Sequence, residues 1–315
     1  MRALHVPAAG EQPQLSELPI PEPGEGTVLV RVKAAGLNPI DNAIAAGMVA
    51  QMMPHQYPVT LGRDAAGVVE AVGPGVEHVK VGDEVVGHVL LAPPIHAGTI
   101  AEYAVLSAAA VFPKPAGLDF VTAAALPLAA AAAVATIDAI DPQPGQTVLV
   151  NGASGGVGSY AVQLLAQRGV TVVATGAPLD VERLTSLGAS EVVDFTEGSV
   201  ADQVLAAHPE GVDALIELAA FAPDDAPLGA VRKGGRVSST TPAANEEALA
   251  AKGLTGTMVM AGPVREVTAP LAQQAADGAL TVDVTTVLPL ERASEGLATI
   301  GAGKARGKIV VKVSD

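Results

Sequence analysis

The sequence predicts an α/β protein of two domains, an irregular β-barrel and a doubly wound parallel sheet. Three observations lead to this fold class. Short strand-like runs punctuated by Gly and Pro fill the chain up to about residue 113. After Pro115, apolar runs alternate with segments of helical length, and one such pair encloses a cluster of glycines. Many short strands with frequent turns are typical of a barrel, whereas apolar strands that alternate with helices are typical of a parallel sheet.

Strands of the first domain are expected at four places. The run TVLVRVKAAGL (27–37) alternates apolar and polar residues, as a half-buried strand does. The runs at 65–76 and 81–91 are similar, with Gly-Pro-Gly and Gly-Asp as turn signals between them. Residues 99–115 add a further pair of strands. Together these segments predict a small barrel.

The second domain is expected to alternate strands with helices. Helices are expected at about 156–168 and 180–187. The expected strands lie at 147–152, 170–176, 190–195, 212–218, 234–240 and 255–262. This rhythm predicts one parallel sheet with helices on both faces.

The C-terminal run GKIVVKV (307–313) is expected to be a lone strand that follows a helix at about 291–302 and returns to the barrel. The expected domains are therefore residues 1–115 with a C-terminal return at 280–315, and residues 116–279.

Composition excludes several classes of function. The formal net charge is −15 and aromatic residues make up 2% of the chain, so a nucleic-acid-binding surface is not expected. The absence of cysteine removes disulfides, thiolate nucleophiles and cysteine-ligated zinc. No stretch has the character of a membrane span, and the N-terminal residues lack the apolar centre of a secretory signal. We therefore expect a soluble, cytoplasmic protein.

The glycine cluster predicts a dinucleotide site. Ala153, Gly155 and Gly158 give A-x-G-x-x-G after an apolar strand and at the start of a helix. Such a loop turns tightly, admits a pyrophosphate close to the backbone and offers the N–H groups of a helix N-terminus. A turn without a ligand is the alternative interpretation. The residues expected to line the pyrophosphate are Ser154, Gly155, Gly156 and Val157.

The end of the next strand bears on the choice of cofactor. NAD-preferring sites place an acid there for the ribose hydroxyls, but this chain has Thr175 and Gly176. The missing carboxylate leaves room for a 2′-phosphate, although the only nearby base is Arg183, one helical turn on. NADPH is therefore favoured by the absence of repulsion, and NADH is not excluded.

Later strand ends supply further expected contacts with the cofactor, because ligands collect at the carboxyl edge of such sheets. These expected contacts are Leu218, Ala219, Thr240 and Thr241.

Taken together, these motifs make the chain similar to a known family. It resembles the zinc-independent quinone oxidoreductase branch of the medium-chain dehydrogenase/reductase superfamily. The stretch GQTVLVNGASGGVGSYAVQ (145–163) matches the signature of that branch, which the chain leaves at Ala166. Further matching segments, in the expected order, are AAGLNPIDNAIAAG, LGRDAAGVVEAVGPGV, VGDEVVG, AALPLAAAAA and ARGKIVVKV. The resemblance implies a GroES-like barrel domain, a Rossmann domain, an active site in the cleft between them, and a homodimer.

The same resemblance locates the positions at which zinc-dependent relatives hold their catalytic metal. These relatives carry a cysteine and a His-Glu pair where this chain has Asn38, Arg63 and Asp64. Asp64, His88 or His96 could in principle bind a divalent cation, but scattered histidines are more often ordinary loop residues. We expect no metal.

The expected absence of a metal limits the reactions that the protein can catalyse. Oxidation of simple alcohols becomes difficult, whereas hydride transfer from a reduced nicotinamide to an already electrophilic carbon stays feasible. The expected function is NADPH-dependent reduction of a quinone or an α,β-unsaturated carbonyl compound. An enoyl-thioester reductase is one alternative, and an NADPH-binding regulatory or structural protein without turnover is another.

Two residues are expected in the catalytic region. By family correspondence, Asn38 lies near the nicotinamide, where its amide could hold a carbonyl oxygen; a turn-forming asparagine is the alternative. Asp41 is expected to cap the next helix and orient the loop more than to transfer protons. Arg63 could pair with Asp64, pair with Asp41 or face the pocket.

The expected pocket is wide and apolar. Where relatives often carry a tyrosine, this chain has Met48, Val49 and Ala50, and after LPL it has the near-uniform run AAAAAVAT. No side-chain proton donor is apparent, so we expect water to protonate the product.

Overall fold

A computed structural model describes residues 1–314 and confirms the α/β class. The chain forms two compact units. Unit 1 holds residues 1–131 and the C-terminal segment from residue 262, and unit 2 holds residues 132–261. Among the described residues, no helix is both long enough and apolar enough to cross a membrane.

Unit 2 is built on a six-stranded sheet in which every neighbouring pair is parallel. The strand order is β11-β10-β9-β12-β13-β14, so the chain order reverses on either side of β9. This confirms the doubly wound sheet and places a topological switch point beside β9. The strands are β9 (Thr147–Asn151), β10 (Thr171–Gly176), β11 (Glu191–Asp194), β12 (Val212–Glu217), β13 (Val231–Ser239) and β14 (Thr255–Met258).

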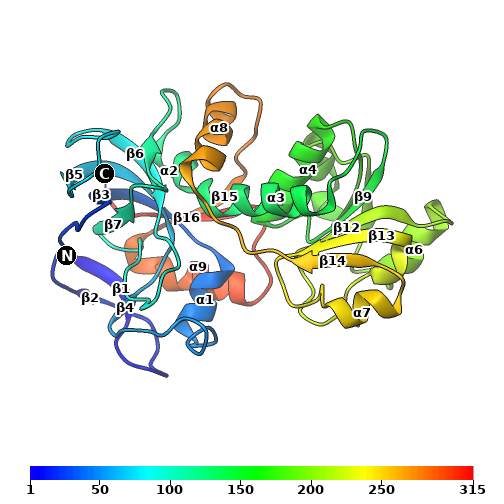
Figure 1. Ribbon diagram of the computed structural model, residues 1–315, viewed down its shortest axis with the longest axis horizontal. Helices are drawn as coiled ribbons and strands as arrows, with labels where there is room; N and C mark the ends of the chain where they lie inside the picture. Colours follow the sequence, from blue (N-terminus) through cyan, green and yellow to red (C-terminus); the bar gives the residue numbers. More distant parts are fainter. Residues whose placement is uncertain (315) are drawn as a thin grey trace. The chain divides into compact units, whose positions relative to one another are not determined.

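Helices flank this sheet, with α4 and α7 on opposite sides (Figure 1). The polar residues Ser199 and Asn245 begin α6 and α7 as N-caps, because their side chains accept hydrogen bonds from the first turn at 3.2 and 2.9 Å. The helices that contribute to unit 2 are α3 (Pro127–Ile140), α4 (Gly156–Gln167), η1 (Pro178–Asp180), α5 (Val181–Ser186), α6 (Val200–Ala207), η2 (Leu228–Ala230) and α7 (Glu246–Ala251).

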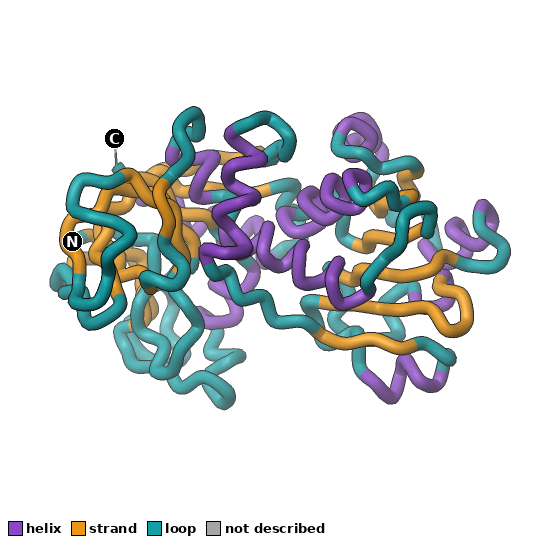
Figure 2. Tube along the Cα trace, turned by 45° about the horizontal axis from the view of Figure 1, so that its top comes forward, coloured by secondary structure: helices purple, strands orange, loops and turns teal. Residues whose placement is uncertain are grey.

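Strands and loops dominate the first part of unit 1 (Figure 2). Its larger sheet runs β15-β16-β3-β5-β6-β8, with β7 also paired to β3, and its smaller sheet runs β2-β1-β4. The strands are β1 (Arg2–Val6), β2 (Gln14–Glu17), β3 (Thr27–Gly36), β4 (Val59–Thr60), β5 (Asp64–Val72), β6 (Glu84–His88), β7 (Tyr103–Ser107), β8 (Phe112–Pro113), β15 (Val284–Pro289) and β16 (Lys308–Lys312). The helices are α1 (Pro39–Ala45), α2 (Phe120–Ala124), α8 (Arg265–Ala276), η3 (Leu290–Arg292) and α9 (Ala293–Gly301).

The C-terminal strand returns to the barrel, as the sequence predicts. Strand β16 pairs antiparallel with β3, with Val310 opposite Gly36. It is not a lone strand, however, because β15 pairs with its other edge in parallel. The sequence analysis also missed β1, β2 and β4, three strands of only two to five residues each.

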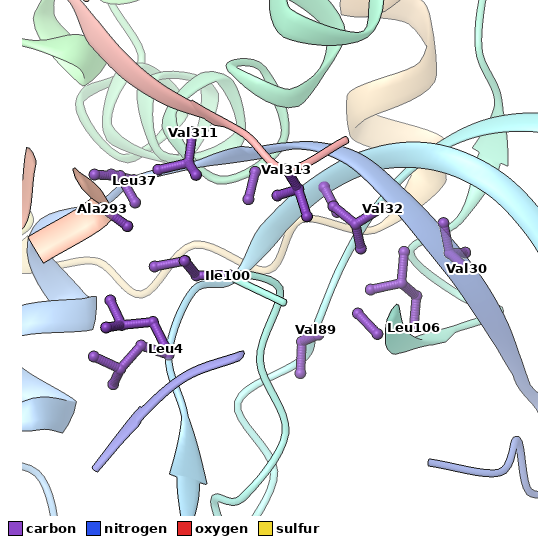
Figure 3. Close-up of a cluster of buried hydrophobic side chains, with 14 of the residues drawn as sticks. Leu4, Val30, Val32, Leu37, Val89, Ile100, Leu106, Ala293, Val311 and Val313 are labelled. Atoms are coloured by element: carbon purple, nitrogen blue, oxygen red, sulfur yellow. The ribbon is translucent and has the colours of Figure 1, made fainter. Parts of the chain in front are cut away.

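Both ends of the chain share the core of unit 1. Leu4, Ala293 and Val311 belong to one cluster of buried side chains with Val30 and Ile100 (Figure 3). Burial of this apolar surface holds the C-terminal segment against the N-terminal strands. Consequently, residues from β16 can take part in a site whose other members lie in the first hundred residues.

A close backbone approach at the end of β3 prepares that site. A Cβ atom at Gly36 would lie 2.3 Å from the Ala124 carbonyl oxygen of α2, so only glycine fits there. The close packing of α2 fixes the path of the chain just before Asn38.

Unit 1 extends further along the chain than the domain boundaries expected at residues 116 and 279. Helix α2 packs on β3 and β5. The first residue of α8, Arg265, donates its backbone N–H to the carbonyl oxygen of Ala109 at 2.9 Å. Both helices therefore belong to unit 1.

Candidate functional site

The glycine loop joins β9 to α4 at the carboxyl edge of the unit 2 sheet. Its left-handed residue is Gly152, with φ of 84°, and not the following Ala153, which is buried. This explains why alanine is accepted in the first glycine position of the motif. Gly158 serves a different need, because a Cβ there would lie 2.4 Å from the Gly152 carbonyl oxygen. The helix can approach the strand end only without a side chain at 158.

Gly155 is left with room around it. It is the N-cap of α4 with φ of −81°, a conformation open to any residue, and a Cβ there would meet only the Gly152 oxygen at 3.4 Å. The protein itself therefore does not require glycine at 155. The first turn of a helix carries N–H groups without intrahelical acceptors and a partial positive charge. Ser154, Gly156 and Val157 lie half-buried beside this end, which suits a phosphate group.

The two residues at the end of β10 face inward. Thr175 is 2% exposed, and its hydroxyl oxygen accepts a hydrogen bond from Gly152 N at 2.9 Å and donates to Asn151 Oδ1 at 3.1 Å. Gly176 is also buried, and a Cβ there would lie 2.6 Å from a Leu184 methyl carbon. Thr175 thus holds the backbone of the glycine loop at Gly152.

Arg183 brings a positive charge to the same loop. Its guanidinium donates to the Ser154 carbonyl oxygen at 3.0 Å and pairs with Asp180 at 3.2 Å. The sequence places Arg183 only one helical turn after the strand, whereas the structure places it against the glycine loop. This contact depends on the tertiary fold and could not be read from the spacing.

The later strand ends line the same edge. Leu218 N donates to Asn151 O at 3.0 Å, and Thr240 N donates to Glu217 O at 3.3 Å. Thr241 Oγ1 lies 2.8 Å from Ser239 Oγ and donates to the Ala220 carbonyl oxygen. Ala219 is exposed and follows Leu218 directly. Leu218 and Ala219 follow β12, which is next to β9, and Thr240 and Thr241 follow β13, which is next to β12.

Sequence reasoning missed an acid at this edge. Glu217, the last residue of β12, is fully buried. Its carboxylate accepts four hydrogen bonds, two from Asn151 Nδ2 at 3.0 and 2.8 Å and two from Ala219 N and Ala220 N at 2.7 and 2.8 Å. Burial raises the pKa of Glu217, and the hydrogen bonds to its charged form oppose that rise. The available signal was an acid that ends an apolar strand.

Unit 1 contains a second group of buried polar side chains, here called the polar cluster: Asn38, Asp64, His88 and Lys308. Each is at most 3% exposed. Asn38 Oδ1 accepts from Lys308 Nζ at 2.7 Å, and Asn38 Nδ2 donates to Asp64 Oδ2 at 2.9 Å. The other oxygen of Asp64 accepts from the His88 ring at 2.7 Å and from Leu128 N at 3.1 Å. Both polar side-chain atoms of Asn38 and both oxygens of Asp64 therefore have hydrogen-bond partners.

Lys308 is the second residue that sequence reasoning missed. It begins β16, and its ammonium also donates to Leu37 O at 2.9 Å and lies 3.9 Å from Asp64 Oδ2. Burial lowers the pKa of Lys308, and the Asp64 charge opposes that fall. A basic residue in an otherwise apolar strand was the available signal. Because its hydrogen-bond partners Leu37 and Asn38 lie about 270 residues earlier in the chain, the sequence did not indicate what it contacts.

Asp41 lies in the first turn of α1, whose N-cap is Asn38. Its Oδ2 accepts from Asn38 N at 2.8 Å, so the carboxylate closes the loop back onto the cap residue. Its Oδ1 has no hydrogen-bond partner among residues 1–314. Burial raises the pKa of Asp41 to about 7, although the nearby Arg63 acts in the opposite direction.

Arg63 forms neither of the two ion pairs considered from the sequence, with Asp64 or with Asp41. Its guanidinium donates to the carbonyl oxygens of Thr60, at 3.3 Å, and Ala97. In the described part of the chain it forms no ion pair with Asp41 or Asp64 within 4.0 Å. It also borders a hollow of about 140 Å³ beside residues 89–97.

These residues do not fit a zinc ion. The chain has no cysteine, and across residues 1–314 no three His, Asp or Glu side chains are placed to share a metal. Asp64 and His88 are bonded to each other, and the ammonium of Lys308 already supplies a cation next to Asn38 and Asp64. His96 lies elsewhere and bonds to Pro94 O at 3.0 Å.

A matched pair of glycine variants tests the glycine loop. Gly155→Ala should fold like the wild type, because a methyl group there meets no atom closer than 3.4 Å. It should weaken binding of a dinucleotide by about tenfold or more, since the methyl group occupies space meant for the pyrophosphate. Gly158→Ala should instead lower the free energy of unfolding by roughly 1–3 kcal/mol, because its methyl group collides with backbone. Nucleotide titration and denaturant unfolding measure the two effects; equal binding by Gly155→Ala and wild type would contradict this assignment.

The buried Asp41 predicts a pH dependence of stability. Its folded pKa, about 7, lies above the model value of 3.8, so the folded state binds this proton more tightly. The contribution is full below pH 4 and is lost as the pH rises towards and through 7. As the pH rises from 5 to 8, the wild type should therefore lose this contribution while Asp41→Asn does not. The free energy of unfolding of the variant minus that of the wild type should increase by roughly 1–3 kcal/mol over this range. The exposed Asp224→Asn serves as the control, and a difference that does not change with pH would refute the assignment.

Comparison with known proteins places the chain in a family. The alcohol dehydrogenase GroES-like domain matches residues 24–116 and the zinc-binding dehydrogenase domain matches residues 187–311. A chloroplastic quinone oxidoreductase of Triphysaria versicolor is 31% identical over 94% of this chain and 92% of its own length. The NADPH-dependent alkenal/one oxidoreductase of Arabidopsis thaliana is 30% identical over 94% of this chain and 74% of its own length.

Solved structures agree with this. The quinone oxidoreductase of Coxiella burnetii superposes with a TM-score of 0.88 at 27% identity and covers 100% of this chain and 99% of its own. A mycobacterial protein complexed with NADPH gives 0.86 at 26% identity over 99% and 100% of the two chains, and an NAD-dependent alcohol dehydrogenase gives 0.87 at 32% identity over the whole of both. The barrel with its returning C-terminal strand, the glycine loop and these full-length matches lead to one conclusion: the chain is an oxidoreductase that belongs to the quinone oxidoreductase branch of the medium-chain dehydrogenase/reductase superfamily.

Proposed function

We propose that the protein uses NADPH to deliver hydride, without a metal, to a quinone or an α,β-unsaturated carbonyl compound. The observation that carries this proposal is the glycine loop at the start of α4, where Gly155 leaves room that the protein does not fill. Names of relatives support the acceptor class, since one is a quinone oxidoreductase and another acts on alkenals and alkenones.

Arg183 supports NADPH over NADH. No carboxylate ends β10, and the guanidinium of Arg183 is held 3.0 Å from the Ser154 carbonyl oxygen of the loop. A guanidinium suits a phosphate because it donates several hydrogen bonds in a planar fork. One similar structure contains NADPH and another is named for NAD, so the preference rests on this residue.

The polar cluster supports a reaction without a metal. A Lewis acid would need ligands that are free to bind it, whereas Asp64 and His88 bond to each other and Asn38 bonds to Lys308. An acceptor that already carries a conjugated carbonyl needs no metal, because that carbonyl takes up the developing negative charge.

The reduced nicotinamide supplies the hydride when it is bound. The residues of this chain bind and orient. Gly155, Gly156 and Val157 receive the pyrophosphate at the α4 N-terminus. Asn38 and Asp41 shape the loop before α1. Asp41 accepts a hydrogen bond from the Asn38 backbone, and Lys308 and Asp64 fix the side-chain amide of Asn38. Water protonates the product.

The direct test follows consumption of NADPH and NADH by the purified protein with a naphthoquinone, a medium-chain enone and a crotonyl thioester in turn. We expect turnover with the quinone or the enone, and the same rate after exhaustive chelation. Preference for the thioester would favour an enoyl-thioester reductase. Binding without turnover on any acceptor would overturn the proposal in favour of a regulatory role.

A second test concerns Arg183. In a titration with each nucleotide, Arg183→Met should raise the dissociation constant for NADPH by about tenfold and that for NADH by less than about twofold. The control is Arg168→Met, which removes an arginine whose partner is the exposed Asp138.

We also propose a homodimer formed through β14. This strand ends the unit 2 sheet, and all four of its residues are exposed. The large apolar side chains of Met258 in the strand and Met260 just after it are exposed as well. An exposed strand edge with apolar side chains is typical of an interface. Sedimentation should give the mass of two chains, and Met258→Lys should give one; a wild-type monomer would contradict the proposal. A cytoplasmic location stays an expectation from the sequence.

A further inference from the structure

A chain of hydrogen bonds crosses the carboxyl edge of the unit 2 sheet. It runs from Gly152 N–H to Thr175 Oγ1, from the Thr175 hydroxyl to Asn151 Oδ1, and from Asn151 Nδ2 to the Glu217 carboxylate. The three bonds measure 2.9, 3.1 and 2.8 Å. We call Thr175, Asn151 and Glu217 the strand-end network. Asn151 and Glu217 end β9 and β12, and Thr175 is the next-to-last residue of the neighbouring β10.

The hydrogen bonds of the strand-end network all run in one direction. A carboxylate only accepts, so it turns the Asn151 amide with its nitrogen towards Glu217 and its oxygen towards Thr175. The amide oxygen in turn takes the hydroxyl hydrogen of Thr175, which leaves a lone pair for Gly152 N–H. The charge on Glu217 therefore sets the acceptor that holds the first residue of the glycine turn.

Glu217 holds a second loop at the same time. Ala219 N and Ala220 N donate to its Oε1 at 2.7 and 2.8 Å. The Ala220 carbonyl oxygen then accepts from Thr241 Oγ1, which is also bonded to Ser239. One buried carboxylate thus ties together the loops after β9, β12 and β13.

The sheet does not need this arrangement. Strands β9 and β12 are already paired in parallel, with Asn151 opposite Glu217 as the last pair of the ladder. A buried carboxylate is costly even when it is hydrogen-bonded, and apolar side chains of similar size often give equal or greater stability. Its place at the switch point, where ligands of such sheets bind, points to a role in shaping the loops.

We propose that Asn151 and Glu217 are positioning residues for the cofactor, which hold the glycine loop and the 218–220 loop in the geometry that binds a dinucleotide. This proposal deepens the proposed function and rests on it. Neither side chain needs to touch the cofactor, because both act through Gly152 and the backbone of Ala219 and Ala220.

Exchange of the two polar groups gives a sharp test. In Glu217→Gln the new amide nitrogen replaces Oε2, 2.8 Å from Asn151 Nδ2, and leaves only the longer contact of 3.0 Å to Oε1. In Asn151→Asp two carboxylates face each other. Each single variant therefore weakens the hydrogen-bond network. The double variant Asn151→Asp/Glu217→Gln rebuilds it, because the new amide donates to the new carboxylate and its oxygen still receives the Ala219 and Ala220 N–H groups. Each single variant should weaken NADPH binding by about tenfold, and the double variant should recover to within about threefold of the wild type.

A control on the same strand pair separates positioning from stability. Asp213 lies at the other end of β12, where it accepts from Thr147 N, the first residue of β9, at 2.8 Å. Asp213→Asn should change the denaturant midpoint yet leave NADPH affinity within about twofold of the wild type. If either single exchange does not fold, Thr175→Val and Thr175→Ser decide the matter: only the valine variant, which lacks the acceptor for Gly152 N, should bind NADPH more weakly.

Fluorescence titration with NADPH and NADH, beside denaturant unfolding of every variant, gives the answer. Tight binding by the single variants, or a double variant no better than the weaker single, would overturn the positioning role while leaving the proposed function intact. So would an equal loss in Asp213→Asn. A wild-type protein that binds neither nucleotide would overturn the proposed function and this inference together.

Discussion

The close approach of α4 to the end of β9 is the constraint on which the carboxyl edge of the sheet depends. Gly158 permits that approach, since a Cβ there would collide with the backbone of Gly152 and Ala153. The left-handed turn needed to enter the helix is made at Gly152. With both requirements met by these two glycines, Gly155 and the first N–H groups of α4 remain available to a ligand. The loop therefore separates residues that the fold needs from the residue that the ligand needs.

Both units bury a carboxylate and satisfy it in a similar way. Glu217 accepts from a side-chain amide and two backbone N–H groups. Asp64 accepts from a side-chain amide, a ring nitrogen and one backbone N–H group. In each case an asparagine amide lies next to the carboxylate and is fixed by a second partner, Thr175 or Lys308. Such networks add less to stability than to a single, well-defined geometry, because every unmet group in them is costly.

Sequence reasoning predicted the features that depend on local pattern. Apolar runs such as 147–152 and 212–218 predicted strands β9 and β12, and the glycine spacing predicted the loop between β9 and α4. It missed β15, a short and largely exposed strand, and β1, a buried strand of five residues, because such short strands carry no periodic pattern of their own and form only where a partner edge exists. It also missed Lys308 and Glu217, whose meaning lies in contacts with residues about 270 and 66 positions away. Asp41, expected as a helix cap, was found inside the first turn and acts back on the cap residue.

The central claim is that the start of α4 holds the diphosphate of a nicotinamide dinucleotide. A crystal structure of the protein grown with NADPH tests it most directly. The account predicts phosphate oxygens within hydrogen-bond distance of the N–H groups of Gly156 and Val157, with Gly155 in contact and Arg183 turned towards the 2′-phosphate. NADPH bound elsewhere, or a loop at Gly155 that stays empty at saturating NADPH, would contradict it.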